Sequence, residues 1–134
     1  MIWLLDTDTC IRYLNPRPSP VQEHLRSHAS HQIALCDIVK MELYFGAYKS
    51  ERSDHNLQIV SRFFSEFMSL PFDQTAAQIC GRIRADLTKQ GRPIGPYDIQ
   101  IAAIALVHQA TLVTHNTQEF IRVPDLLIED WEAQ

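Results

Sequence analysis

Three acidic residues occupy positions where a soluble domain would normally place apolar ones. Asp6 ends an apolar run that begins at Met1, and Glu42 and Asp98 each lie within the apolar pattern of a predicted helix. A buried carboxylate is costly unless a partner neutralises it. One such residue would suggest a buried ion pair, but three in separate segments predict one shared site that holds a cation.

Each acid also has a structural explanation. Asp6 could cap a helix after the first strand, although Asp8 could do this equally well and would leave Asp6 for other work. Asp98 would gain about 0.3–1 kcal/mol as an acid in the first turn of its helix. Glu42 could lie at a partly exposed edge. Its helical face is otherwise apolar, with Ile38, Met41, Phe45 and Tyr48.

A bound divalent cation would suit this combination of acids. Two unit charges about 4 Å apart repel by roughly 4 kcal/mol at an effective dielectric of about 20, so three bare carboxylates would protonate or separate. Mg²⁺, or Mn²⁺ in its place, prefers oxygen ligands and retains several waters. Such an ion can orient water for attack on a phosphate ester and stabilise the leaving oxygen. The predicted chemistry is phosphodiester hydrolysis without a nucleophilic side chain.

Strands alternate with helices along the whole chain. Apolar runs predict strands at residues 2–6, 32–36, 70–72, 111–114 and 126–128. Helical spacing, with caps at Asp37 and Asp73 and a first-turn Pro96, predicts helices at residues 9–15, 21–28, 37–49, 53–67, 73–90, 97–109 and 117–121.

This order predicts a single α/β domain over residues 1–134. We expect a three-layer sandwich with a central, mainly parallel sheet of four to five strands flanked by helices. Sites in such sheets form beyond the carboxyl ends of the strands. Asp6 and the segment after Thr114 both fall there.

Composition places the chain among ordinary globular proteins. It is 46% hydrophobic and 21% charged, with a net charge of −4 that weakly disfavours a polyanion-binding protein. No apolar run approaches the roughly 18 residues of a membrane span, and no charged segment precedes the first apolar run. The three cysteines lack the spacing of a disulfide framework or zinc site. We therefore expect a soluble, cytoplasmic protein with no membrane segment.

Four motifs contain the three acids and continue towards the end of the chain. They read LLDTDTCI from Leu4, VKMELYFGA from Val39, IGPYDIQIAA from Ile94 and LVTHNTQEF from Leu112. In this order and spacing the chain resembles the PIN-domain ribonucleases, and most closely the VapC-type toxins of bacterial toxin–antitoxin pairs. The resemblance covers almost the whole chain.

The resemblance implies a catalytic site. Asp6, Glu42 and Asp98 correspond to the family's metal-binding acids, and Thr7 and Thr114 to polar residues that support them. The family often has a fourth acid where this chain has Asn116. An amide oxygen can still ligate or orient a water but brings no charge, and Glu119 could compensate. Asn116 and Glu119 complete the predicted catalytic set, and the occupancy of a second metal site stays open.

The resemblance also implies a function and partners. It implies a Mg²⁺-dependent endoribonuclease whose action blocks translation, a VapB-type antitoxin encoded beside it, a homodimer, and a hetero-oligomer with the antitoxin. Relatives that share these motifs most closely cut transfer RNA, notably the initiator, in the anticodon region. Transfer RNA is therefore the expected substrate.

Cations near the predicted site could guide the RNA backbone. Four of them lie between residues 82 and 92 against one acid, Asp86, in the run that leads to Asp98. A solvated helix face explains this run equally well. The predicted RNA contacts are Arg12, Arg82, Arg84, Arg92 and His115.

Two rival functions remain open. Asp6 and Asp8 also fit the D-x-D-x-T motif of a haloacid dehalogenase-like phosphatase, with Asp6 as nucleophile and Asp8 as general acid. That reading leaves Glu42 and Asp98 unexplained. The other rival is a non-catalytic module that binds RNA or a partner with a site that has decayed at Asn116.

Overall fold

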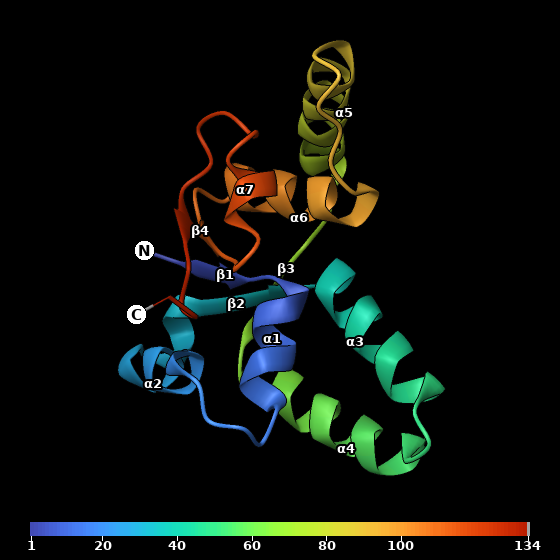
Figure 1. Cartoon of the computed structure of the whole chain (residues 1–134), viewed down its shortest axis with the longest axis vertical. Coiled ribbons are helices and arrows are strands. Elements are labelled where there is room, and N and C mark those ends of the chain that lie inside the picture. The colour runs from blue at the N-terminus through green and yellow to red at the C-terminus, as the bar shows by residue number, and fades with distance from the viewer. Residues whose placement is uncertain (134) are drawn as a thin grey trace.

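A five-stranded parallel sheet forms the centre of the computed structural model, which describes residues 1–133 (Figure 1). Its strands are β1 (Trp3–Leu5), β2 (Ile33–Cys36), β3 (Met68–Leu70), β4 (Thr111–Val113) and β5 (Ile128–Glu129). Their order in the sheet is β3-β2-β1-β4-β5, and every neighbouring pair is parallel. The expected α/β class and parallel sheet are confirmed.

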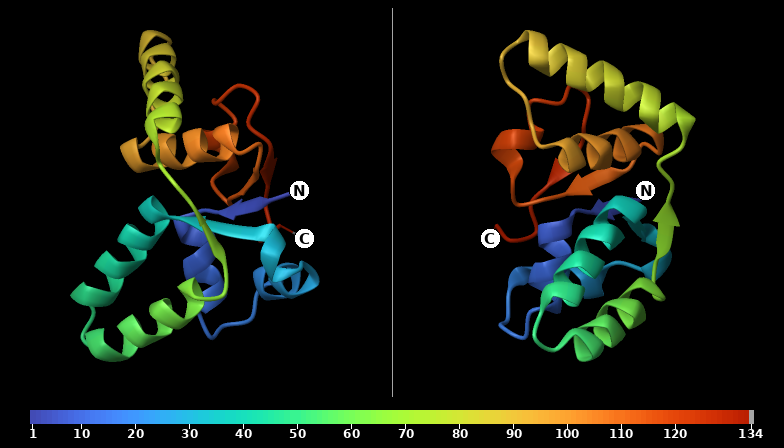
Figure 2. Two further views of the ribbon diagram at one scale, coloured as in Figure 1. Left: turned by 180° about the vertical axis from the view of Figure 1, so that it is seen from behind. Right: turned by 90° about the vertical axis from the view of Figure 1, so that its right-hand side faces the viewer.

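Helices cover both faces of this sheet. One layer contains α1 (Thr7–Leu14), α2 (Pro20–Ser27), α3 (Asp37–Lys49) and α4 (Ser53–Phe64), with a 3-10 turn (Ser30–Gln32) before β2. The other layer contains α5 (Gln74–Lys89), α6 (Pro96–Val107) and α7 (Thr117–Phe120). Both views in Figure 2 show the same division, with α5 packed on α6 and extending away from the sheet.

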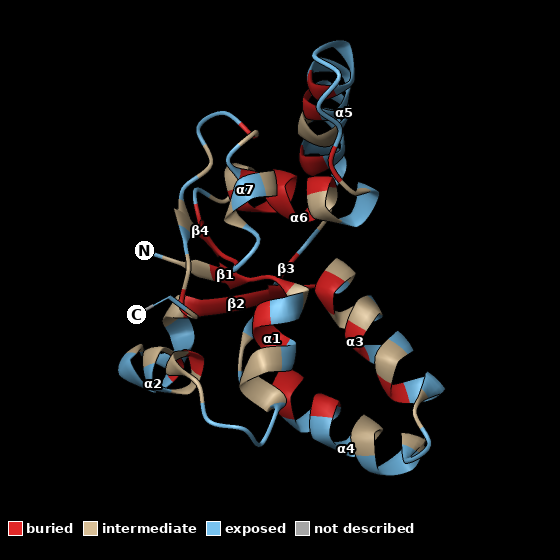
Figure 3. Cartoon of the chain, viewed as in Figure 1, coloured by how far each residue is buried: buried red, intermediate tan, exposed pale blue. Residues whose placement is uncertain are grey.

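The middle of the sheet is the most deeply buried part of the protein (Figure 3). All residues of β2 and β4 are buried, as expected for parallel strands with helices on both faces. α6 adds a continuous apolar run from Ile101 to Ala105, which is 0% exposed throughout. This core fixes the carboxyl ends of β1 and β4 side by side, with Leu5 opposite Val113.

Several predicted element boundaries were wrong by a few residues. The third strand ends at Leu70 rather than spanning Pro71, because proline has no N–H to donate to a strand ladder. α4 ends at Phe64, before the predicted Phe67. Asp37 is the first residue of α3 and not its cap, which is Cys36 without a side-chain hydrogen bond.

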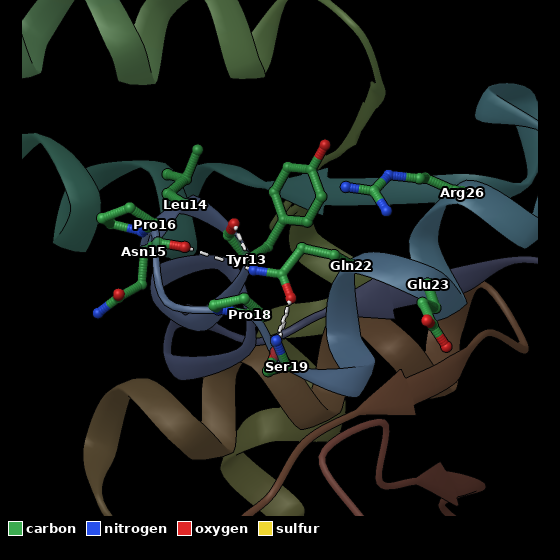
Figure 4. Close-up of a pocket in the computed structure, with 9 residues that line it drawn as sticks. All are labelled: Tyr13, Leu14, Asn15, Pro16, Pro18, Ser19, Gln22, Glu23 and Arg26. Atoms are coloured by element: carbon green, nitrogen blue, oxygen red, sulfur yellow. Dashed lines mark hydrogen bonds between the residues drawn. The ribbon is translucent and has the colours of Figure 1, made fainter.

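The proline-rich connection between α1 and α2 is held by Gln22. Its amide nitrogen lies 3.2 Å from the carbonyl oxygen of Tyr13, and its amide oxygen accepts a 2.7 Å hydrogen bond from the Ser19 N–H (Figure 4). A hollow of about 570 Å³ beside this turn is lined by Tyr13, Glu23 and Arg26, among others. None of the predicted site acids lines this hollow, which is formed by the connection between α1 and α2.

In residues 1–133, none of the helices has the length and apolar character needed to cross a membrane.

Candidate active site

Asp6 lies where β1 meets α1, at the carboxyl end of the sheet. It is 5% exposed and caps α1, with its Oδ1 accepting a 2.9 Å hydrogen bond from the Thr9 N–H. Its own N–H donates to the carbonyl oxygen of Val113 at 3.0 Å, which ties this position to the end of β4. The idea that Asp8 could cap the helix instead is wrong, because Asp8 is exposed in the first turn.

Two threonines support the Asp6 carboxylate. Burial raises the pKa of Asp6, whereas hydrogen bonds from Thr114 and Thr9 act in the opposite direction. Thr114 is fully buried at the end of β4, and its Oγ1 also accepts a 3.0 Å hydrogen bond from the Asn116 N–H. Asp6 is therefore held rigidly by neutral donors, without a cationic partner in the part of the chain described.

Glu42 lies on α3 and contacts the start of α1, the helix that follows Asp6. It is half-buried, and its Oε1 accepts a 2.7 Å hydrogen bond from Thr7 Oγ1. Because Thr7 is the first residue of α1, this bond joins the start of α1 to the middle of α3. The structure thus pairs each predicted supporting threonine with one predicted acid.

The apolar face around Glu42 is not the core-facing side of α3, so that expectation was wrong. Met41, Phe45 and Tyr48 are 40%, 62% and 68% exposed, whereas α3 contacts the core through Val39, Leu43 and Ala47. α3 carries apolar side chains on more than one side, so periodicity could not identify the buried one. Glu42 is only partly buried, and it lies at the edge of the proposed site, where it accepts the hydrogen bond from Thr7.

Asp98 lies in the first turn of α6 and is half-buried. Burial, followed by the charges of Glu119, Asp6 and Glu42, raises its pKa to about 7. The charges of Asp6, Glu42 and Glu119 therefore act on Asp98 from the β1–α1 junction, α3 and α7. Since Glu119 is the largest charge contribution, the fourth acid is also part of this cluster.

Glu119 uses both carboxylate oxygens to hold its surroundings. Oε1 accepts a 2.8 Å hydrogen bond from the Gly95 N–H, and Oε2 accepts one of 2.8 Å from Asn116 Nδ2. Burial alone would raise the pKa of Glu119, but these donors, together with the charge of Arg122, lower it overall. Glu119 is therefore a carboxylate that links α7 to the start of α6.

The donor set fits a hard divalent cation. It consists of carboxylate oxygens, with hydroxyl and amide oxygens beside them, and none of the four acids is paired with a lysine, arginine or histidine within residues 1–133. A Cβ added to Gly95 would lie 3.6 Å from Asp98 Oδ2 and 3.8 Å from Glu119 Oε1, so glycine keeps the space beside them open.

The acids do not converge fully in the conformation described. Over residues 1–133, no three Asp, Glu, His or Cys side chains lie close enough together to hold one ion.

The predicted RNA contacts are dispersed. Arg82 and Arg84 are exposed on α5, and Arg92 is exposed in the loop before α6. Arg12 lies in the last turn of α1, 3.8 Å from Glu132. His115 is exposed beside Asn116, and a hydrogen bond from its ring to Asp130 raises its pKa.

An apolar groove of about 460 Å³ starts at Glu42 and runs between α1, α3 and α4. Its walls are apolar along most of their length, and its lining includes Ile11, Leu43, Gly46, Ala47, Ile59 and Val60. The sequence did not indicate this groove, because it forms where α1 packs against the consecutive helices α3 and α4, which follow it in the chain only after α2 and β2.

Known proteins provide close matches. Residues 3–126 match the PIN domain model. The tRNA(fMet)-specific endonuclease VapC of Salmonella typhimurium is 40% identical over 129 residues, covering 96% of this chain and 97% of that protein. Ribonuclease VapC2 of Rickettsia felis is 35% identical, covering 98% of this chain and 99% of that protein.

Solved structures match equally well. The crystal structure of DNA-bound VapBC from Salmonella typhimurium contains a chain with a TM-score of 0.92 and 39% identity, covering 98% of both chains. The structure of VapBC-1 from nontypeable Haemophilus influenzae gives a TM-score of 0.89 and 32% identity, covering 99% of this chain and 100% of that one.

Proposed function

We propose that this chain, which belongs to the PIN-domain family and within it to the VapC ribonucleases, is the Mg²⁺-dependent endoribonuclease toxin of a toxin–antitoxin pair. In this proposal residues 1–134 act as one PIN domain that blocks translation by cutting RNA. The observation that supports the proposal is the mutual influence of Asp6, Glu42, Asp98 and Glu119, whose charges raise the pKa of Asp98 and which have no basic partner in residues 1–133.

Divalent-metal dependence is general among VapC nucleases with a PIN domain, and we propose Mg²⁺ as the ion, with Mn²⁺ as a substitute. Asp6, Glu42 and Asp98 would hold it. When bound, the ion supplies Lewis acidity that activates water and stabilises the leaving oxygen of the phosphodiester. The chain contributes fixed ligand positions, which keep the reorganisation needed for reaction small.

The remaining polar residues would orient this set. Thr7 and Thr114 hold the Glu42 and Asp6 carboxylates through the hydrogen bonds described above. Asn116 donates its Nδ2 to Glu119, so its Oδ1 is the atom available to accept a hydrogen bond from the attacking water. Glu119 acts in this scheme as a support for Asp98 and Asn116.

Transfer RNA is the proposed substrate, with the initiator as the first candidate, because one relative is named a tRNA(fMet)-specific endonuclease. Arg82, Arg84 and Arg92 would contact the phosphate backbone along α5 and the loop that follows it. Arg12 and His115 would do so on the other side of the site.

Toxicity in cells tests this role. Induced expression of the chain should stop protein synthesis, and co-expression of the antitoxin encoded beside it should restore it. If protein synthesis continues unimpaired although the folded chain is present in excess over its antitoxin, the chain is not a toxin.

The proposed partners are a VapB-type antitoxin and a second copy of the chain, since the matched solved structures are VapBC assemblies. The groove beside Glu42 would take an apolar antitoxin segment that carries a cation towards the acids. Such a segment would inhibit the enzyme by occupying the site. The exposed aromatic side of α3 is a candidate surface for the homodimer.

Filling this groove should weaken antitoxin binding. Gly46 lies on α3 in the groove wall, and a Cβ there meets nothing within 4 Å, so Gly46→Phe should fold normally. We expect antitoxin affinity, measured by calorimetry, to fall at least about tenfold, the equivalent of about 1.4 kcal/mol. Gly81→Phe, at an equally open helical position on α5, is the control and should bind normally. Equal affinities in both variants would exclude the groove.

Substitution of Asp8 separates the ribonuclease from the phosphatase alternative. The relatives support the former reading, and Asp8 is exposed and outside the hydrogen bonds that hold Asp6. We therefore expect Asp8→Asn to retain RNA cleavage within about threefold of the wild type, since Asp8 acts on Asp6 and Asp98 only through its charge and substitutions of exposed residues usually have small effects. Loss of all activity in Asp8→Asn, with hydrolysis of p-nitrophenyl phosphate by the wild type, would instead favour the phosphatase.

A further inference from the structure

We propose that Arg122 is a positioning residue that, with Glu119, fixes the segment leading into α6 and thereby sets where Asp98 meets the other acids. The inference rests on the proposed metal-dependent function and assigns a role to a residue outside the predicted site. Arg122 follows α7 and lies in none of the motifs that pointed to the acids.

The segment before α6 is held at two points. The carbonyl oxygen of Pro93 accepts a 3.0 Å hydrogen bond from Arg122 Nη1, and the Gly95 N–H donates to Glu119 Oε1 at 2.8 Å. Gly95 is the N-cap of α6, and its carbonyl oxygen accepts the first helical hydrogen bond, from the Ile99 N–H at 3.0 Å. The first turn of α6, which contains Asp98, therefore starts from a backbone fixed on both sides of Ile94.

α7 provides a rigid base for these two contacts. Phe120 is 0% exposed and Val123 3% exposed, so the segment is anchored in the core on either side of Arg122. The Arg122 N–H donates to the Glu119 carbonyl oxygen at 3.2 Å, which places the two residues in one turn of chain. Figure 1 shows α7 beside α6, as these contacts require.

One of the two side chains holds the segment as a hydrogen-bond donor and the other as an acceptor. Glu119 accepts from the N–H of the N-cap Gly95, one of the donors that no residue within the helix can satisfy. Arg122 donates to the carbonyl oxygen of Pro93, two residues before that cap. The Arg122 charge also offsets the Glu119 carboxylate, which lies near Asp98. Arg122 Nε is buried without a partner within the described chain, a cost that a surface arginine would not carry.

Substitution of Arg122 tests this role through metal binding as well as activity. Arg122→Met keeps the length and apolar stem of the side chain but removes the donor and the charge. We expect Mn²⁺ affinity, measured calorimetrically without RNA, to fall about tenfold, and kcat to fall about 10–100-fold, as for other supporting residues of metal sites. KM for RNA should change less than about twofold, because Arg122 would not touch the substrate.

Arg62→Met is the matched control, since it removes the same charge from an exposed position on α4. It should leave Mn²⁺ affinity and kcat at the wild-type values. If Arg122→Met does not fold, as judged by cooperative thermal unfolding, Arg122→Lys provides the test. Lysine keeps the charge but not the guanidinium geometry, so we expect an intermediate loss of Mn²⁺ affinity.

Two results would overturn the inference, and a third would refute the proposed function on which it rests. If folded Arg122→Met has the Mn²⁺ affinity and kcat of the wild type, Arg122 does not position the site. The same conclusion follows from wild-type values in Arg122→Lys, should the methionine variant not fold. A change confined to KM would make it an RNA contact. Failure of the wild-type protein both to bind Mn²⁺ and to cleave RNA would instead refute the proposed function on which the inference rests.

Discussion

Replacing Asp98 with asparagine is expected to lower kcat for RNA cleavage by at least about 100-fold at saturating Mg²⁺. Asparagine keeps the size and the first-turn position but removes one of the charges that would hold the ion. Loss of a preorganised charge at a reacting centre costs about 10²–10³-fold in other enzymes. Mn²⁺ affinity should fall with it, because an amide oxygen is a weaker ligand for a hard cation.

Asp125→Asn is the matched control for this variant. Asp125 is exposed in a loop with a φ of 68°, a conformation that asparagine adopts readily, so the substitution should leave fold and activity unchanged. Both variants should be assayed on one defined transfer RNA across a Mg²⁺ titration. Cleavage by Asp98→Asn at the rate of Asp125→Asn would remove Asp98 from the reaction.

Metal-free protein is expected to lose stability as the pH rises from about 4 to about 7. The pKa of Asp98 in the folded protein is about 7, against about 3.9 in an unfolded chain. Between these values the folded state binds the extra proton, so this group's contribution is fully present at low pH and lost as the pH rises through about 7. After solvent screening of a partly exposed group, we expect a loss of about 1–2 kcal/mol, or several degrees in Tm.

Comparing the wild type with Asp98→Asn isolates the contribution of Asp98 to the pH dependence of stability. Both proteins contain His115 and Glu119, so the effects of those two groups are present in both profiles. The variant should lack the decline and be more stable than the wild type near pH 8 without metal. Saturating Mg²⁺ should restore wild-type stability near pH 8, since the ion would favour the ionised carboxylate. Thermal unfolding in EDTA and in Mg²⁺ provides the measurement, and parallel pH profiles of the two proteins would show that Asp98 is not perturbed in this way.

The sequence predicted the sheet because apolar runs and breakers are local signals. β1, β2 and β4 appear where expected, and Pro96 is in the first turn of α6, as predicted. The boundaries that failed depend on tertiary contacts or on hydrogen bonding. Met68–Leu70 forms a strand because it pairs with β2, and the local apolar run did not show that the pairing would stop at Leu70, before Pro71.

The three acids were identifiable because carboxylates are unusual beside apolar runs, although the reason given for Glu42 was partly wrong. Its apolar neighbours on α3 are exposed, so the unusual feature was an apolar surface and not a buried acid. The support for the site could not be predicted. The Gly95 N–H and Glu119 are 24 residues apart, and only the fold brings them to 2.8 Å.

Arg122 illustrates the limit of pattern reading. A single arginine after a short helix carries no periodic or motif signal, and its contact with Pro93 spans 29 residues. The role of Arg122 becomes visible only in the structure, where the Pro93 carbonyl that it holds lies two residues before the N-cap of the helix containing Asp98. Residues that act through the backbone of another segment are invisible to spacing arguments for this reason.

If Asp6, Glu42 and Asp98 form the site of a metal-dependent ribonuclease, the purified chain should cleave total cellular RNA only when a divalent cation is present. The protein must be folded and free of antitoxin, and the reactions should contain Mg²⁺, Mn²⁺ or EDTA. We predict discrete fragments with either metal and none with EDTA, with a transfer RNA band lost first. RNA that stays intact in every metal-containing reaction, or fragments of equal yield in EDTA, would contradict the account.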